Sequence, residues 1–550
     1  MQLTGSQIIM ECLKEQKVEY IFGYPGGQIM PVYNALYDYM DCFKHIRTSH
    51  EQGAVHAADG YARSTGKVGV CFATSGPGAT NTVTGIATAY MDSVPLVVIT
   101  GQVPLSMIGK DSFQEVDITG ISLPITKHNF FIKDISVLAD SIRSAFEIAQ
   151  SGRPGPVLID VPKNFQIETT EYLRTEIERQ ENIKKIEKQS LKKIADLINK
   201  AERPVIYSGG GVIISEASDE LRTFVKKTEI PVLNTLMGLG SFPRTEKLSL
   251  GMIGMHGFKE ANLAMNNSDL ILAIGARFSD RVTGDTNRFA TKSTVVHIDI
   301  DESEISKNVK AHYPLIGDIR DILSNLIPLV DKKDRSRWVG EIQKWKKPQK
   351  SKKEEFLPEN ILRTAHEVLG NDTLVTTEVG QHQMWTAQFW PFIKPRSFMT
   401  SGGLGTMGYG FGAAIGTQLG NPDKTVLHIS GDGSFRMNLN ELATVAHYKL
   451  PIITLIMKND TLGMVRQWQK LFFDKRYSAT DISDDINYEK LAEAFDVTGK
   501  NVYDLDLLKT CIKEASEDRK SMLIVCHINI DEDVFPIVPP GEAINNQVFK

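Results

Sequence analysis

The fold is indicated by an apolar strand that runs directly into a glycine-flanked aspartate. This segment reads Val426-Leu427-His428-Ile429-Ser430-Gly431-Asp432-Gly433-Ser434. Short runs that are rich in valine and isoleucine and apolar on both faces are typical of buried parallel strands. Similar runs recur at 94–100, 157–161, 205–207, 270–274, 295–300, 452–457 and 522–528. Because they alternate with helical patterns, the sequence predicts an α/β protein whose sheets are mainly parallel and sandwiched by helices.

The length and two charged segments predict three consecutive α/β domains. The chain has 550 residues, which is too long for one ordinary domain. Charged stretches with few bulky apolar residues occupy 171–200 and 331–353. We therefore expect domains at 1–170, 191–335 and 359–550, joined by linkers at 171–190 and 336–358.

Composition excludes several classes of function. The net charge is only -5 and no basic patch stands out, so we expect no nucleic-acid partner. No run of 18 or more apolar residues is present, so we expect no membrane span. The beginning of the chain reads as helix, strand and turn instead of a signal peptide, and the five cysteines show no paired spacing. These features predict a cytoplasmic protein without a zinc site.

The segment that follows the first quoted strand suits a phosphate and a metal ion. Glycines let backbone N–H groups approach a phosphate closely, and a following helix N-terminus favours negative charge. Asp432 and Asn459 each end an expected strand and each supply an oxygen of the kind that Mg²⁺ prefers. Gly-Asp-Gly alone is as readily a simple turn, but Asn459 at the end of the next strand favours the metal. The Asn438-x-x-Glu441 spacing predicts a capped helix between them.

Gly431-Asp432-Gly433 followed by Asn459 resembles the signature of thiamine-diphosphate (ThDP) enzymes. The family usually has Asn-Asn where this chain has Lys458-Asn459. The resemblance implies ThDP and Mg²⁺, with the metal held by Asp432, Asn459 and the carbonyl of Thr461. It also implies that Met407 lies beneath the bent cofactor. The other implied ThDP contacts are Val379, Gly380, Gln381, His382, Gly405, Gly431, Gly433, Ser434, Gly463 and Met464.

Segments at 22–27, 50–54 and 73–81 resemble, in that order, the pyrimidine domain of acetohydroxyacid synthases. The stretch His50–Arg63 is expected to be a helix with small residues on one side, as at a subunit interface. The resemblance implies that Glu51 hydrogen-bonds to the cofactor's aminopyrimidine. It further implies that the two ends of ThDP are held by different subunits, so at least a homodimer is expected, and a homotetramer stays open.

Segments at 110–117 and 463–468 match substrate-lining segments of the synthases. The resemblance implies catalytic or acceptor-placing roles for Gly27, Phe113, Gln114, Lys163 and Trp468. The implied reaction decarboxylates pyruvate on ThDP and ligates the hydroxyethyl unit to pyruvate or 2-ketobutyrate. The resemblance implies that this reaction belongs to branched-chain amino acid biosynthesis, on the valine and isoleucine branches.

The segment Gly275–Gly284 resembles the FAD-binding segment of the anabolic synthases, where FAD has no net redox role. Arg277 and Arg281 suit phosphates and ring stacking. The remaining residues assigned to FAD by this resemblance are Arg153, Thr235, Leu236, Met255, His256, Gly275, Asp299 and Asp318.

Three alternatives stay open. They are a catabolic synthase without FAD, a flavin-dependent pyruvate oxidase, and a non-catalytic nucleotide-binding protein. Anabolic relatives use a separate regulatory subunit, and both the binding of such a subunit and the acceptor preference are left undetermined by the sequence. The chain departs from the family pattern at Gln28, Ser279, Phe411-Gly412 and Lys458.

Overall fold

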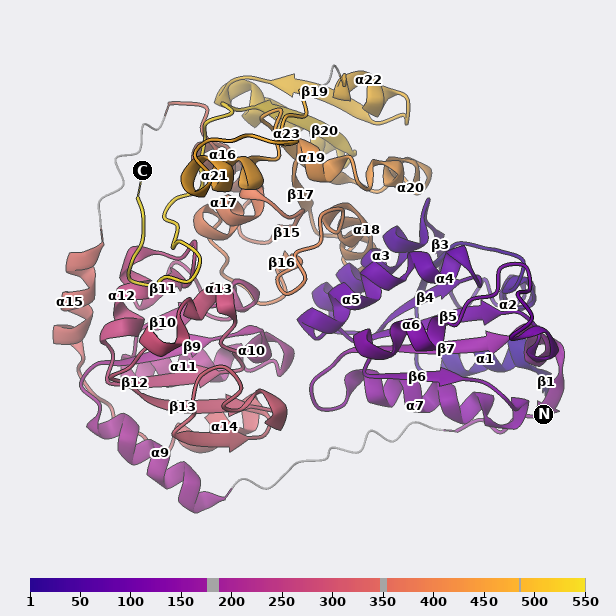
Figure 1. Ribbon diagram of the computed structural model, residues 1–550, viewed down its shortest axis with the longest axis horizontal. Helices are drawn as coiled ribbons and strands as arrows, with labels where there is room; N and C mark the ends of the chain where they lie inside the picture. The colour runs from indigo at the N-terminus through magenta and orange to yellow at the C-terminus, as the bar shows by residue number, and fades with distance from the viewer. Residues whose placement is uncertain (176–186, 347–353, 484–485, 550) are drawn as a thin grey trace.

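The computed structural model describes residues 1–175, 187–346, 354–483 and 486–549. These residues form three α/β units, each built on a six-stranded sheet whose paired strands are all parallel (Figure 1). The predicted α/β class is therefore confirmed. The strand runs anticipated from the sequence all lie in these sheets.

The first sheet has the strand order β3-β2-β4-β5-β7-β6. Its strands are β2 (Tyr20–Gly23), β3 (Lys44–Arg47), β4 (Gly69–Ala73), β5 (Leu96–Gln102), β6 (His128–Phe131) and β7 (Pro156–Pro162). The associated helices are α1 (Gly5–Glu15), α2 (Met30–Tyr37), α3 (Glu51–Thr65), α4 (Pro77–Asn81), α5 (Val83–Asp92), α6 (Ile118–Ser122), α7 (Leu138–Gln150) and α8 (Lys163–Ile167). A small antiparallel pair, β1 (Gln2–Thr4) with β8 (Thr169–Glu171), closes this unit.

The middle sheet has the order β11-β10-β9-β12-β13-β14. Its strands are β9 (Pro204–Ser208), β10 (Val232–Asn234), β11 (Ser249–Met252), β12 (Leu270–Ile274), β13 (Thr294–Asp299) and β14 (Tyr313–Ile316). Its helices are α9 (Lys188–Lys200), α10 (Gly210–Ile214), α11 (Ser218–Thr228), α12 (Lys259–Asn267), α13 (Asp280–Thr283), α14 (Ile319–Leu326) and α15 (Ser336–Trp345). The chain runs outward from the centre in both directions, so the order reverses between β9 and β12, where such folds bind ligands.

The third sheet has the order β16-β15-β17-β18-β20-β19. Its strands are β15 (Leu374–Thr377), β16 (Phe398–Met399), β17 (Val426–Gly431), β18 (Ile452–Lys458), β19 (Thr498–Val502) and β20 (Met522–His527). Its helices are α16 (Pro358–Leu369), α17 (Gln381–Phe389), α18 (Gly410–Gly420), α19 (Asp432–Phe435), α20 (Leu442–His447), α21 (Gly463–Phe472), α22 (Tyr488–Glu493) and α23 (Leu505–Asp518). Counted along the chain, its strands follow the same order as those of the first sheet, so the two outer units share one topology.

The segment 336–345, which the sequence places in a linker, is helix α15. Trp338 and Ile342 lie in the apolar core of the middle unit, and the Trp338 indole donates to the Pro204 carbonyl at 3.1 Å. This helix therefore belongs to the middle unit. Of the other predicted linker residues, 176–186 and 347–353 lie outside the described residues, whereas α9 begins at Lys188 and α16 at Pro358. The domain boundaries stay a prediction.

The predicted helix at His50–Arg63 is present as α3, with the His50 ring accepting from the Gln52 N–H at its start. Its small side chains face α18 of the same chain. A Cβ added to Gly416 would lie 1.7 Å from the Ala57 carbonyl oxygen, and one added to Gly60 would lie 2.1 Å from that of Ala413. The close backbone packing expected at a subunit interface thus joins the first and third units within one chain.

The capped helix expected after Asn438 is not formed as predicted. Asn438 makes no side-chain cap; its amide donates to the Gly408 carbonyl at 3.1 Å. Glu441 accepts instead from the Ser49 and His50 N–H groups, each at 3.1 Å, ahead of α3. The local capping pattern is therefore replaced by a tertiary contact, because the unpaired N–H groups at the start of α3 need acceptors.

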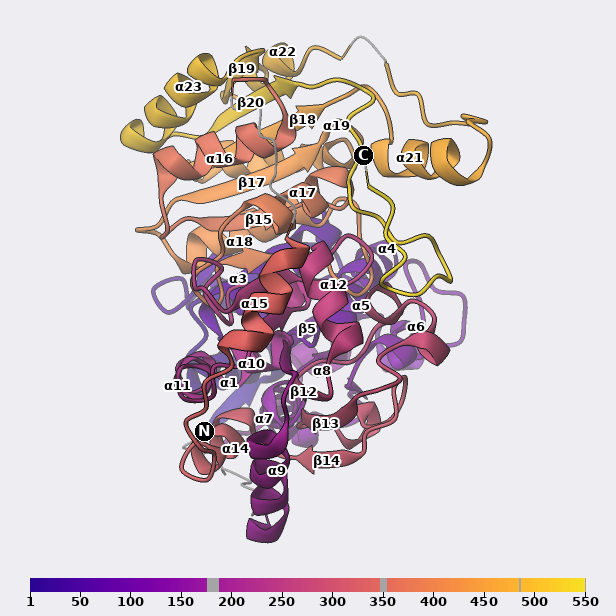
Figure 2. The same cartoon turned by 90° about the vertical axis from the view of Figure 1, so that its left-hand side faces the viewer.

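The C-terminal segment crosses from the third unit onto the middle one (Figures 1 and 2). The Val538 N–H donates to the Met255 carbonyl at 2.9 Å, and Asn262 donates to the Ile544 carbonyl at 3.0 Å. The longest described helix, α3, has 15 residues, and none of the helices in the described ranges has the length and apolar character that a bilayer crossing requires.

Candidate active site

The carboxyl edge of the third sheet brings Asp432 and Asn459 together. Strands β17 and β18 pair in parallel with Gly431 opposite Met457, so the loops that follow both strands leave the same edge. The Asp460 N–H donates to Asp432 Oδ2 at 2.9 Å, and the Thr461 N–H lies 3.4 Å from Asn459 Oδ1. The three residues predicted as metal ligands are therefore neighbours, and all three are buried.

The oxygens at this edge fit a magnesium ion. Asp432 is 1% exposed, and burial raises the pKa of its carboxyl to about 6. Asn459 donates its amide N–H to Gln381 Oε1 at 3.2 Å, which fixes which end of the amide carries the oxygen. Among the described residues no three His, Cys, Asp or Glu side chains cluster, so a metal bound here would depend on amide and backbone oxygens as well.

Lys458, where the family usually has Asn, forms an ion pair with the carboxylate of Asp460. The Asp460 backbone N–H still reaches Asp432. The departure from the family pattern is thus accommodated beside the predicted ligands without displacing them.

The segment Val379-Gly380-Gln381-His382 borders the same edge. His382 is buried, its Nε2 has no hydrogen-bond partner among the described residues, and burial lowers the pKa of its ring to about 3. A Cβ added to Gly431 would lie 2.9 Å from His382 Nδ1, so glycine is needed there. An unpartnered imidazole beside a glycine-rich loop fits a phosphate oxygen.

The predicted catalytic residues of the first unit form a second cluster. Asn81 donates to Glu51 Oε2 at 2.9 Å, and the Lys163 ammonium donates to the Gly27 carbonyl at 3.0 Å. The backbone of Gln114 lies against Gly76, where an added Cβ would meet it at 2.8 Å. Phe113, in contrast, is 83% exposed.

The two clusters make no direct polar contact with each other within the described residues. Across the described residues, no hydrogen bond or ion pair links Glu51 to Asp432, Asn459 or His382. The start of α3 is tied instead to Glu441. The two clusters would hold opposite ends of one cofactor, so no direct contact between them is required.

A cavity of about 1200 Å³ lies among the three units. All ten residues assigned to FAD line it: Arg153, Thr235, Leu236, Met255, His256, Gly275, Arg277, Arg281, Asp299 and Asp318. The same cavity reaches Val379, Gly380, Gly405, Met464 and Trp468, which the sequence assigned to ThDP or substrate. The predicted flavin and ThDP regions are thus connected.

The floor of this cavity is a close approach of glycines at the reversal of the middle sheet. Gly275 has φ +59°, and an added Cβ would lie 2.6 Å from Gly211 Cα. A dinucleotide phosphate is commonly held at such a switch point. The glycines at 209–211 were missed from the sequence, although a glycine run directly after the strand at 205–207 was a usable signal.

Some charged side chains around the cavity already form ion pairs or hydrogen bonds within the chain. Arg153 pairs with Asp301 at 3.2 Å and with Glu304 at 2.7 Å. Asp318 caps its own helix, accepting from the Arg320 N–H at 2.9 Å. The Arg281 guanidinium lies 5.9 Å from the Trp468 ring centre, and the Trp468 indole N–H is buried without a partner among the described residues.

Comparison with known protein families agrees with the division of the chain into three α/β units. Residues 3–121 match the model for the thiamine pyrophosphate enzyme N-terminal TPP binding domain, residues 191–326 the central domain, and residues 378–526 the C-terminal TPP binding domain.

The similar curated proteins extend over almost the whole chain. A probable acetolactate synthase large subunit of Methanocaldococcus jannaschii is 46% identical, covering 99% of this chain and 95% of its own length. The acetolactate synthase large subunit of Porphyra purpurea is 43% identical over 98% of this chain and 94% of its own, and that of Haemophilus influenzae is 41% identical over 100% and 98%.

Proposed function

The chain belongs to the thiamine pyrophosphate enzymes, and among them to the acetolactate synthase large subunits, and we propose on this premise that it makes 2-acetohydroxy acids. The substrates are pyruvate and a second 2-keto acid, either pyruvate or 2-ketobutyrate. The products are 2-acetolactate and 2-aceto-2-hydroxybutyrate. The observation that carries the proposal is the carboxyl edge where Asp432 and Asn459 lie together and where His382, whose Nε2 has no partner among the described residues, borders Gly431.

Mg²⁺ and the diphosphate are assigned to this edge. Asp432, Asn459 and the Thr461 carbonyl would hold the metal, because their oxygens suit a hard divalent cation. The His382 imidazole and the N–H groups of the Gly431–Ser434 loop would hold the phosphate oxygens. When bound, ThDP supplies the nucleophilic carbon and the electron sink for decarboxylation of the keto acid.

Glu51 would hold a proton at the cofactor's aminopyrimidine. It is nearly buried at the first turn of α3, and the Asn81 amide fixes one of its oxygens. A carboxylate held in place in this way is oriented for a single hydrogen bond. Gly27, Gln114 and Lys163 lie beside this region and would place the second keto acid together with Phe113 and Trp468.

FAD is assigned to the cavity of about 1200 Å³. Its arginines and its close glycine approach fit a dinucleotide phosphate, and its volume suits a large ligand. Carboligation involves no net oxidation, so FAD would serve there as a structural cofactor.

The assembly is proposed to be at least a homodimer. The resemblance to acetohydroxyacid synthases, in which different subunits hold the two ends of ThDP, supports a complete site formed by the first unit of one copy and the third unit of another. A separate small subunit fits the "large subunit" names of the relatives. All five cysteines are free, which fits a cytoplasmic location.

Product analysis tests the function. Wild type, Glu51→Gln and Glu15→Gln would be incubated with pyruvate, ThDP and Mg²⁺. Glu15 is a matched control, because it is a largely buried carboxylate of the same unit that pairs with Arg143 at 2.9 Å, away from Asn81. We expect acetolactate from wild type and the control, and a large loss in Glu51→Gln.

Two other results would redirect the assignment. Acetaldehyde or acetyl phosphate as the main product would move the chain to another branch of the ThDP enzymes. Bleaching of a bound flavin by pyruvate at the turnover rate would identify a flavin oxidoreductase instead. A purified protein without any flavin absorbance would favour the synthase class that lacks FAD.

A further inference from the structure

The turn that carries Met407 runs from Ser401 to Gly410 between β16 and α18. It reads Ser401-Gly402-Gly403-Leu404-Gly405-Thr406-Met407-Gly408-Tyr409-Gly410. Gly405 and Gly408 have φ +71° and +87°, so the backbone is in the left-handed region on either side of Met407. No regular ladder of hydrogen bonds fixes such a turn, so its shape depends on what accepts its N–H groups.

The later end of the turn is held by Glu378, which follows β15. Glu378 is fully buried and accepts from the Gly408 N–H at 2.6 Å and from the Phe411 N–H at 3.0 Å. The same carboxylate accepts from the Ser434 hydroxyl at 2.9 Å. One side chain therefore connects the Met407 turn to the loop that follows Gly431.

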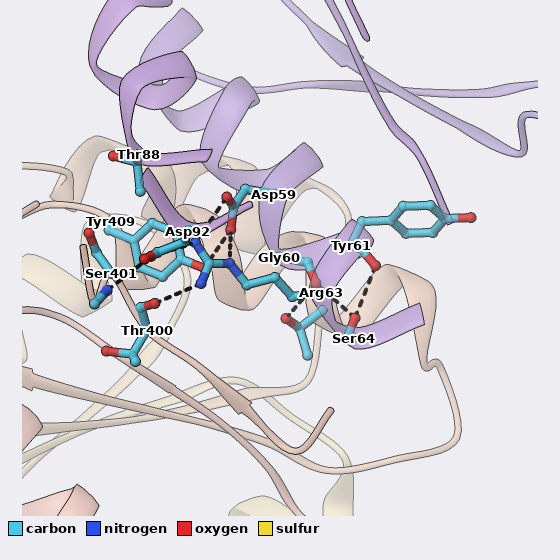
Figure 3. Close-up of polar contacts among 12 residues, drawn as sticks. Asp59, Gly60, Tyr61, Arg63, Ser64, Thr88, Asp92, Thr400, Ser401 and Tyr409 are labelled. Carbon is cyan, nitrogen blue, oxygen red and sulfur yellow. Dashed lines mark hydrogen bonds and ion pairs between the residues drawn. The ribbon is translucent and has the colours of Figure 1, made fainter. Parts of the chain in front are cut away.

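The N-terminal end of the turn is held by Asp92, which belongs to the first unit. Asp92 is the last residue of α5 and accepts from the Gly402 N–H at 3.0 Å and from the Gly403 N–H at 2.7 Å. Arg63 pairs with Asp92 at 3.0 Å and with Asp59 at 2.6 Å, and donates to the Thr400 carbonyl at 2.9 Å. Figure 3 shows this arrangement, in which Tyr409 also reaches Asp59.

We propose that Asp92 and Glu378 are positioning residues, two carboxylates that hold opposite ends of one turn and so set the place of Met407 under the cofactor. The inference rests on the proposed role of Met407. Hydrogen bonds from backbone N–H groups to a buried carboxylate are strong and directional. Two pairs of them, at 402–403 and 408–411, leave the middle of the turn little freedom to move.

The two holders act from different domains. Glu378 belongs to the third unit, whereas Asp92 reaches the turn only because α3 and α5 pack against that unit. The position of Met407 therefore depends on the contact between the first and third units of the same chain. This holds whether Glu51 of the complete site comes from the same chain or from another copy.

Cofactor affinity tests the proposal independently of turnover. Binding of ThDP in the presence of Mg²⁺ would be measured by calorimetry on wild type, Asp92→Asn, Glu378→Gln, Met407→Ala and the control Glu15→Gln. Loss of one charge-assisted hydrogen bond predicts affinity that is weaker by about ten-fold or more in the two carboxylate variants. Glu15→Gln should bind ThDP as wild type does. Thermal unfolding of each apoprotein shows whether the variant is folded.

A double-mutant cycle separates positioning from general stability. Among the described residues, Asp92 makes no hydrogen bond or ion pair with the loop that follows Gly431. If it acts through Met407, then Asp92→Asn combined with Met407→Ala should weaken binding no further than the larger single change. Additive losses, or wild-type affinity in both carboxylate variants, would overturn the proposal. Wild-type affinity in Met407→Ala would overturn it as well, by removing the role of Met407. Failure of the wild type to make acetolactate would instead reject the proposed function.

If either carboxylate variant does not fold, Asp92→Glu and Glu378→Asp replace it. These variants keep the carboxyl group and move it by one methylene, so the same loss of ThDP affinity is expected in both, and Asp92→Glu should show the same non-additivity with Met407→Ala.

Discussion

At the scale of single residues, mutation can distinguish the predicted metal ligand Asp432 from the neighbouring carboxylate of Asp460. Asp432 is buried at the strand edge, whereas the Asp460 side chain is paired with Lys458 and partly exposed. We expect Asp432→Asn to abolish Mg²⁺-dependent ThDP binding, because the carboxylate charge that balances the cation is lost. Asp460→Asn should retain binding, since only its backbone N–H contacts Asp432. Calorimetric titration of both variants decides this, and equal losses would contradict the ligand assignment.

A second residue-scale expectation concerns pH. Burial raises the pKa of Asp160 from its ordinary value of 3.8 to about 7, while Thr100 and Gln102 hydrogen-bond to its carboxyl. The native state therefore keeps a proton that the unfolded chain releases. The resulting stability is fully present below about pH 4 and is lost as the pH rises through about 7.

Asp160→Asn cannot ionise, so its urea midpoint should fall less than that of wild type between about pH 5 and about pH 8. Asp134→Asn is the control. Hydrogen bonds from Ser136 lower the pKa of this exposed carboxyl, so it stays ionised across that window. Parallel behaviour of wild type and Asp160→Asn would count against a protonated Asp160.

At the scale of elements, the contact between α3 and α18 depends on missing side chains. Gly416→Ala would place a methyl group against the Ala57 carbonyl, so the helices must separate. We expect a loss of about 1–3 kcal/mol in unfolding free energy, as for other overpacked contacts. Gly340→Ala in α15 is the control, since nothing lies within 4 Å of its added Cβ and alanine favours a helix. Denaturant unfolding of the two variants measures the difference.

At the scale of the whole molecule, a site shared between two copies predicts complementation between two inactive chains. When Glu51→Gln and Asp432→Asn are co-expressed, mixed dimers would carry one site with both native residues. Random pairing gives about a quarter of wild-type activity for a dimer with two shared sites. If each site instead lay within one chain, the mixture would be inactive. Differently tagged copies allow the mixed dimer to be purified and assayed for acetolactate.

The sequence alone determined the fold class and most of the candidate residues, because those signals are local. Buried parallel strands must be apolar on both faces, so β17 and β18 were visible as runs, and Asp432 and Asn459 as the residues that end them. The glycine and arginine segments assigned to FAD were likewise contiguous, and all of the assigned residues line one cavity.

Only the tertiary structure decided the contacts between residues that are far apart in the chain. Glu441 accepts hydrogen bonds at the start of α3 instead of completing the expected local cap. Helix α15 packs in the core of the middle unit, although the sequence predicted a linker there. Asp92, Arg63 and Glu378 gave no pattern at all, because their partners lie in distant segments. Periodicity and spacing report what a residue must do for its own helix or strand, whereas these side chains stabilise the packing between units.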